Sequence, residues 1–147
     1  MRQILSIAAL LAVVAFVSQT NAADDKGKAV CPVAGKPANP NQTVDYKGAK
    51  VSLCCGKCKA AFTKNPAKFA AKANLQLVAT KQAKQVNCPF AGKPVNPAQS
   101  VTVAGTEVQF CCGGCKAKAS KVKGDEQIKL IFNDKAFEKG FKVTKKQ

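Results

Sequence analysis

A pattern of four cysteines occurs twice in this chain of 147 residues, and it constrains the fold more than any other feature. Each copy begins with C-P-x-A-G-K-P and ends in C-C-G-x-C, and corresponding cysteines lie 57 positions apart. The first set is Cys31, Cys54, Cys55 and Cys58. The second set is Cys88, Cys111, Cys112 and Cys115. These are all eight thiols of the protein, so the bonds that they form should decide how the chain folds.

The repeat extends beyond the cysteines. Aligning Cys31–Ala60 with Cys88–Ala117 gives 18 identities in 30 positions without a gap. A solenoid needs about three or more stacked repeats, so two copies indicate two small tandem domains. We predict a first unit at 23–80, a linker at 81–87 and a second unit at 88–147. Units of about 50–60 residues rarely bury enough apolar surface without a disulfide or metal staple.

The N-terminus resembles a secretory signal peptide. Arg2 precedes an apolar run at Ile4–Val17, and small residues suit cleavage after Ala22. The run is shorter than the roughly 20 apolar residues that a membrane span needs. We therefore predict a signal peptide at 1–22 and a soluble mature protein in the periplasm or outside the cell, without stable membrane insertion.

Alternating apolar residues predict a β-hairpin in each unit. In the first unit they occupy 44–46 and 51–53 around a turn at Lys47-Gly48, and the second unit repeats this pattern around Ala104-Gly105. The second strand of each hairpin leads directly into C-C-G-x-C.

One or two short helices should follow each hairpin. Lys57–Lys64 has helix-forming composition, and Asn65-Pro66 is a typical start for a further helix at Pro66–Ala73. In the tail, Glu126–Phe132 fits a strand or a helix, and Asn133 is a candidate N-cap of a last helix. The expected fold class is small α+β.

The formal charge of +16 comes almost entirely from lysine. Apart from Arg2 the chain has no arginine, and its aromatic content is only 6%. Nucleic-acid readers depend on arginine for base contacts and on aromatics for stacking, so we predict no nucleic-acid partner. An anionic surface or another protein remains a candidate partner. Histidine is absent and no carboxylates form a catalytic pair, so we expect no enzymatic activity.

The cysteine spacing C-x22-C-x3-C suggests a metal site. A strand-to-helix corner that supplies two thiolates, closed by a thiolate from a preceding loop, is a common zinc-binding arrangement. Thiolates favour Zn, Cu(I) and other soft ions, and no imidazole is available. We predict one such ion per unit, bound by the two sets of cysteines, in a protein that binds, traffics or senses a soft metal.

The sequence leaves the fourth ligand open. Neighbouring side chains of a strand point to opposite faces, so Cys54 and Cys55 share an ion only if the strand has ended before them. Otherwise each site has three thiolates and one open position, which suits binding and release. We predict that Cys55 and Cys112 are the most replaceable cysteines and that the first and last of each set are indispensable.

Two other interpretations compete with metal binding. Disulfides form in exported proteins, so each unit can instead hold two bridges, such as Cys31–Cys54 with Cys55–Cys58, in a disulfide-stapled extracytoplasmic interaction module. The C-x-x-C segments at 55–58 and 112–115 also permit thiol–disulfide exchange, although no βαβ framework accompanies them.

The chain resembles tandem YHS/TRASH-type heavy-metal-binding domains. The resemblance rests on the C-x22-C-x3-C spacing, the apolar strand end at Val51–Cys54, and Phe62 followed by Asn65-Pro66 and Phe69. YHS domains usually open with D-P-V-C-G, whereas this chain has Cys31-Pro32-Val33-Ala34-Gly35, which agrees better with the TRASH spacing. The resemblance implies two treble-clef-like units and a role in metal binding, sensing or trafficking.

Overall fold

The computed structural model describes residues 29–144, so the predicted signal peptide at 1–22 lies outside the described residues. The elements are, in chain order, β1 Asn39–Tyr46, β2 Ala49–Leu53, α1 Gly56–Lys64, α2 Pro66–Ala79, β3 Ala83–Gln85, β4 Asn96–Val103, β5 Thr106–Phe110, α3 Gly113–Ser120, α4 Gly124–Phe132, α5 Asp134–Gly140 and β6 Phe141–Val143. The fold is small α+β, with antiparallel strand pairs. Within the described range, no helix has the length and apolar character needed to cross a membrane.

Both predicted hairpins are present. β1 pairs with β2 in antiparallel register, with Tyr46 opposite Ala49 across the turn. Lys47 and Gly48 both have positive φ, at 51° and 79°, as a two-residue turn with the twist of a hairpin requires. β4 and β5 repeat this register 57 positions later. The duplicated sequence has therefore produced two matching corners at which a hairpin leads into a helix.

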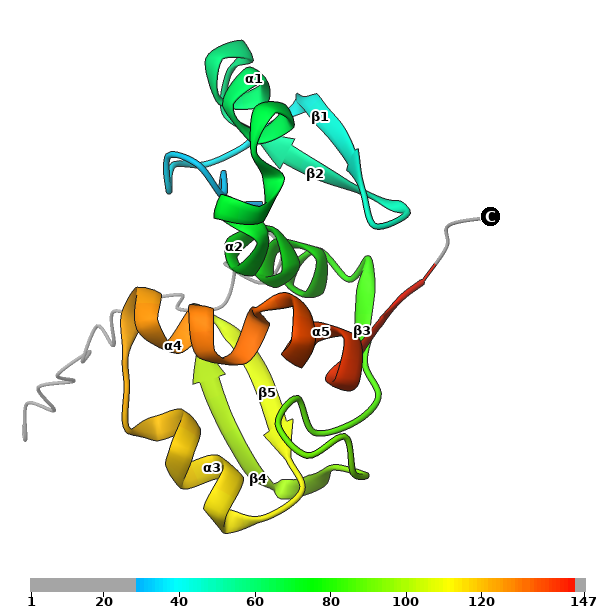
Figure 1. Cartoon of the computed structure of the whole chain (residues 1–147), viewed down its shortest axis with the longest axis vertical. Coiled ribbons are helices and arrows are strands. Elements are labelled where there is room, and N and C mark those ends of the chain that lie inside the picture. Colours follow the sequence, from blue (N-terminus) through cyan, green and yellow to red (C-terminus); the bar gives the residue numbers. More distant parts are fainter. Residues whose placement is uncertain (1–28, 145–147) are drawn as a thin grey trace, which may run out of the picture.

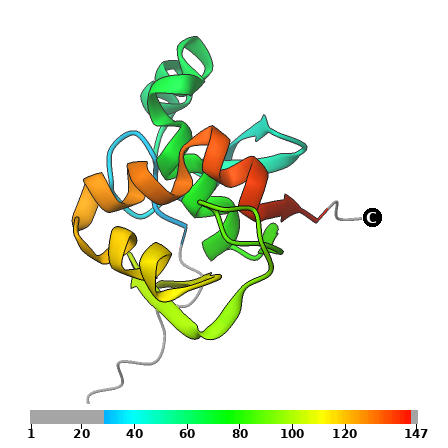
Figure 2. The ribbon, with the colours of Figure 1, turned by 60° about the horizontal axis from the view of Figure 1, so that its bottom comes forward.

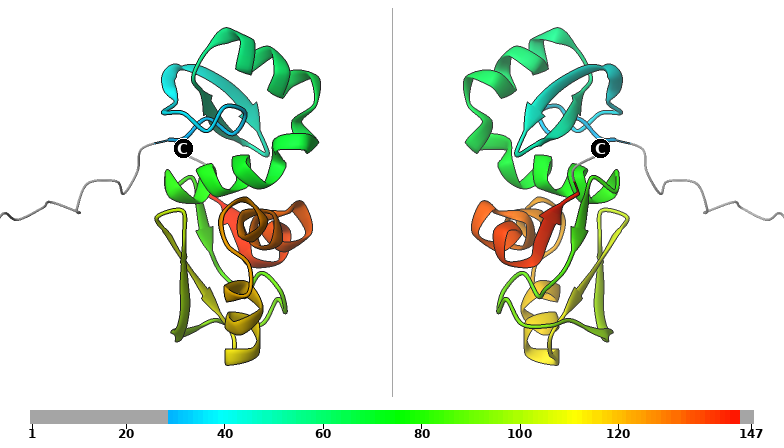
Figure 3. Two further views of the ribbon diagram at one scale, coloured as in Figure 1. Left: turned by 90° about the vertical axis from the view of Figure 1, so that its left-hand side faces the viewer. Right: turned by 90° about the vertical axis from the view of Figure 1, so that its right-hand side faces the viewer.

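The two hairpins lie at opposite ends of the molecule, and α2, α4 and α5 lie between them (Figures 1 and 3). α1 follows the first hairpin and α3 follows the second. Figure 2 shows α4 and α5 running across the middle of the molecule. The buried apolar side chains form one cluster that contains residues of both repeats. The two units thus share a core rather than having one each.

α2 begins as predicted and then continues further. The Asn65 side chain caps it by accepting a hydrogen bond from Lys68 N at 3.3 Å, and Pro66 is its first residue. The helix ends at Ala79 rather than at Ala73, because its second half is buried between the two hairpins. Leu77 is fully buried there, in the same cluster as Ile131 of α4.

The segment Glu126–Phe132, for which the sequence allowed a strand or a helix, is part of helix α4. Ile128, Ile131 and Phe132 are buried, at a spacing that places them on one helical face. Asn133 caps α5 as predicted, by accepting from Ala136 N at 3.0 Å. The second hairpin is therefore followed by three helices, and the expectation of one or two was wrong for this unit.

The predicted linker at 81–87 contains a strand. Ala83–Gln85 forms β3, which pairs antiparallel with β6 near the end of the described chain. The tail also reaches the first hairpin, because Asp134 accepts a hydrogen bond from Tyr46 Oη at 3.3 Å and forms an ion pair with Lys47 at 2.8 Å. The C-terminal segment therefore joins the two repeats.

Candidate metal centre

Each unit brings three of its four cysteines together. The Sγ atoms of Cys31, Cys54 and Cys58 all lie within 4.8 Å of one another, and those of Cys88, Cys111 and Cys115 do the same. In the first unit the thiols come from the loop before β1, from the residue after β2 and from the first turn of α1. We call these groups triad one and triad two.

A tight turn positions the first thiol of each triad. Cys31 N donates to Lys36 O at 2.8 Å, and Gly35 N donates back to Cys31 O at 2.9 Å. Gly35 has φ of 68°, a conformation that a side chain at this position would strain. The same two hydrogen bonds recur around Cys88, each at 2.8 Å. The C-P-x-A-G-K motif is therefore a rigid platform for one buried thiol.

The second and third cysteines lie just beyond the strand. β2 ends at Leu53, so Cys54 and Cys55 are both outside it and the alternation of strand side chains does not separate them. Their Sγ atoms are 3.8 Å apart, as are those of Cys111 and Cys112. Cys55 nevertheless does not belong to the mutually close triad. It lies beside Cys54 and Cys58, at the N-cap of α1, and outside the group that also includes Cys31.

The spacing between thiols matches that of a shared metal ion. Two thiolates bound to one tetrahedral ion at about 2.3 Å lie about 3.8 Å apart. The observed Sγ–Sγ distances are 3.5 Å for Cys54–Cys58 and 3.8 Å for Cys111–Cys115. The buried thiol of each triad lies within 4.8 Å of these two, so the three thiols together can accept one soft ion.

Within the first set, two thiols are predisposed to ionise. Burial by itself would raise the pKa of Cys31, but hydrogen bonds from the backbone N–H groups of Ala34, Cys54 and Val33 bring it below the ordinary value. The N–H of Cys58, at the start of α1, lowers the pKa of Cys55. The pKa of Cys58 is raised to about 12, first by its hydrogen bond with Cys54. A metal ion would therefore bind at thiols of which two, Cys31 and Cys55, give up their protons more easily than an ordinary thiol, and it would displace protons from those that remain protonated.

Burial gives each centre an inner and an outer side. Cys31 and Cys88 are fully buried, whereas Cys55 and Cys112 are exposed. The other four cysteines are intermediate. All eight are free thiols. The arrangement can thus hold an ion against a buried thiol while leaving one side open to an incoming ligand.

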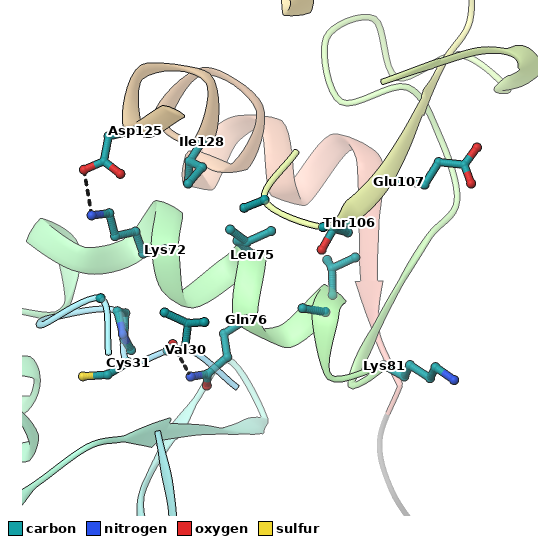
Figure 4. Close-up of a pocket in the computed structure, with 16 residues that line it drawn as sticks. Val30, Cys31, Lys72, Leu75, Gln76, Lys81, Thr106, Glu107, Asp125 and Ile128 are labelled. Atoms are coloured by element: carbon teal, nitrogen blue, oxygen red, sulfur yellow. Dashed lines mark hydrogen bonds and ion pairs between the residues drawn. The ribbon is translucent and has the colours of Figure 1, made fainter. Parts of the chain in front are cut away.

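Two glutamines that sequence analysis did not single out also contribute to the centre. Gln76 in α2 and Gln85 in β3 each hydrogen-bond to the backbone next to the triads. Figure 4 shows Gln76 reaching Val30, the residue before Cys31, at one side of a groove of about 420 Å³. No periodicity or motif marks either residue in the sequence.

Comparison with family models, curated proteins and solved structures finds no match to this chain. The resemblance to YHS and TRASH domains therefore stays a prediction that rests on the residues quoted above.

Proposed function

We propose that this protein is an exported carrier of soft metal ions that binds one ion, Zn or Cu(I), in each of its two thiol centres. The observation that carries this proposal is the pair of matching triads, whose Sγ atoms lie within 4.8 Å of one another. Two centres of the same geometry, built by corresponding residues, are what a duplicated metal-binding unit requires. The proposed function also agrees with the resemblance to YHS/TRASH-type domains.

We further propose that the exposed thiols, Cys55 and Cys112, take part in exchange rather than in tight holding. Cys55 lies 3.8 Å from Cys54 on the open side of its centre, so it can complete a fourth coordination position or give way to a thiol of a partner. A soft ion bound by three protein thiolates keeps a position at which a ligand can enter. This arrangement favours trafficking over purely structural use of the metal.

Native mass spectrometry of the reduced chain without its first 22 residues, under anaerobic conditions and titrated with zinc or Cu(I), tests the proposal. We expect two ions per chain and loss of one ion in Cys58→Ser. Cys55→Ser should keep two ions but should slow transfer to a competing thiol chelator. Absence of retained metal, with only hydrogen loss on oxidation, would instead establish the disulfide interpretation.

A further inference from the structure

A glutamine side chain bridges the two chain segments that carry the first and second thiols of triad one. Gln76 Oε1 accepts from Ser52 N at 2.7 Å, and its Nε2 donates to Ser52 O and to Val30 O, each at 2.7 Å. Ser52 lies two residues before Cys54, and Val30 directly precedes Cys31. The amide thus fastens the Cys31 loop to the strand that leads into Cys54.

The same bridge occurs at triad two. Gln85 Oε1 accepts from Gln109 N at 2.9 Å, and its Nε2 donates to Gln109 O at 2.6 Å and to Asn87 O at 3.1 Å. Gln109 lies two residues before Cys111, and Asn87 directly precedes Cys88. The backbone positions that are bridged correspond in the two repeats.

The two glutamines themselves do not correspond. Gln76 comes from α2, after its hairpin, whereas Gln85 comes from β3, before its hairpin. The residue 57 positions after Gln76 is Asn133, which caps α5 instead. Duplication alone therefore cannot account for the bridge. The shared feature is the requirement to join the residue before the first cysteine to the strand before the second.

We propose that Gln76 and Gln85 are positioning residues that set the separation of the first thiol of each triad from the other two, and so set the metal affinity of each centre separately. This inference rests on the proposed metal-binding function. Gln76 itself is only 3% exposed, and its three hydrogen bonds are partly shielded from water, so its loss leaves three backbone groups without their protein partner. Groups that orient metal ligands typically change affinity by about 10–100-fold when they are mutated.

The chain contains a matched control in Gln82. Its Oε1 accepts from Lys50 N at 2.9 Å and its Nε2 donates to Lys50 O at 2.8 Å. It therefore makes the same pair of bonds to the same strand, β2, as Gln76 makes. Its remaining side-chain bond is to Thr80 Oγ1 at 2.9 Å, so the bonds of Gln82 do not include the Cys31 loop.

The test compares Q76E, Q85E and Q82E in the reduced chain without its first 22 residues. Glutamate keeps the size and the acceptor oxygen but cannot donate to the two carbonyl groups. With zinc and a competing chelator, we expect Q76E and Q85E each to weaken one of the two sites tenfold or more and to spare the other. Q82E should bind like the unsubstituted protein.

A second measurement needs no metal. Cys31 and Cys88 are fully buried, so alkylation followed by mass spectrometry reports how firmly each loop is held. We expect faster alkylation of Cys31 in Q76E and of Cys88 in Q85E. If Q76E fails to fold, the comparison of Q85E with Q82E tests the proposal instead. Gln85 is only partly buried, so its substitution should disturb folding less.

The inference and the proposed function fail in different ways. Equal weakening of both sites in Q76E or Q85E, unchanged alkylation rates, or an effect of Q82E as large as that of Q76E would overturn the positioning role. An unsubstituted protein that retains no metal would overturn the proposed function, whereas the alkylation pattern would still decide whether the glutamines hold the loops.

Discussion

Gly140 offers a sharp test of how the tail supports the second centre. It is the last residue of α5 and is buried against Pro89, the residue after Cys88. A Cβ added at Gly140 would lie 2.8 Å from Pro89 Cα and 3.0 Å from Pro89 N. Gly140 O also accepts hydrogen bonds from Val86 N at 2.8 Å and from Asn87 N at 3.1 Å.

The cost of Gly140→Ala follows from these contacts. Ordinary contacts of a Cβ begin at 3.4 Å, and the opposing atoms belong to the backbone of a fully buried proline, which cannot swing away. Overpacking of this kind costs about 1–3 kcal/mol. Weakening the two hydrogen bonds to Gly140 O adds about 1 kcal/mol. The free energy of unfolding should therefore fall by about 3 kcal/mol. This is a large part of the roughly 5–15 kcal/mol that is the total free energy of unfolding of a typical domain.

We therefore expect Gly140→Ala to lower the Tm of the reduced protein by about 10 °C. Since Cys88 adjoins the displaced Pro89, triad two should also lose metal affinity while triad one keeps it. Thermal unfolding followed by circular dichroism, together with chelator competition, measures both effects. Gly56→Ala is the control, because a Cβ there meets no atom within 4 Å. A Tm within 2 °C of the unsubstituted protein, or equal loss of affinity at both triads, would contradict this account.

Three further results are expected. Burial opposes ionisation of Asp134, but its hydrogen bond with Lys47 keeps its pKa below 3.8. Asp134→Asn should therefore lower Tm at neutral pH, where the carboxylate contributes, and should match the unsubstituted protein once the pH has fallen through that lowered pKa. Because Cys58 has a pKa of about 12, zinc binding should release protons and strengthen from pH 6 to pH 8, which a pH indicator and chelator competition can follow. Chelator with reductant should lower protection from hydrogen exchange, and unchanged protection would show that the shared core suffices.

The local features of this fold were predictable where a few residues determine them. The turn at Lys47-Gly48 follows from alternating apolar residues and a glycine that accepts positive φ, and it formed as expected. Asn65 and Asn133 cap helices because their short side chains reach free N–H groups. The matching triads follow from the spacing of cysteines around each hairpin.

Features that depend on distant residues escaped prediction. α2 extends to Ala79 because α4 packs against it, and no pattern in residues 74–79 predicts that contact. β3 has three residues, too few for a pattern, and it forms by pairing with β6. The role of Gln76 depends on two backbone segments that lie 24 and 46 positions earlier in the chain. Such a residue cannot be recognised until the fold has brought those segments together.

The two glutamines that hydrogen-bond to β2, Gln76 and Gln82, have one more consequence. All four residues Ala49–Ser52 lie opposite β1, but in an antiparallel pair only every second residue exchanges backbone hydrogen bonds with its partner. Ala49, beside the two-residue turn, and Val51 occupy those positions, so the backbone groups of Lys50 and Ser52 point outward along a free strand edge. Gln82 occupies both groups of Lys50, and Gln76 occupies both groups of Ser52. Two side-chain amides therefore take the place of a third strand. An open edge is a template for aggregation, and here that template is blocked by residues that cannot themselves propagate a sheet.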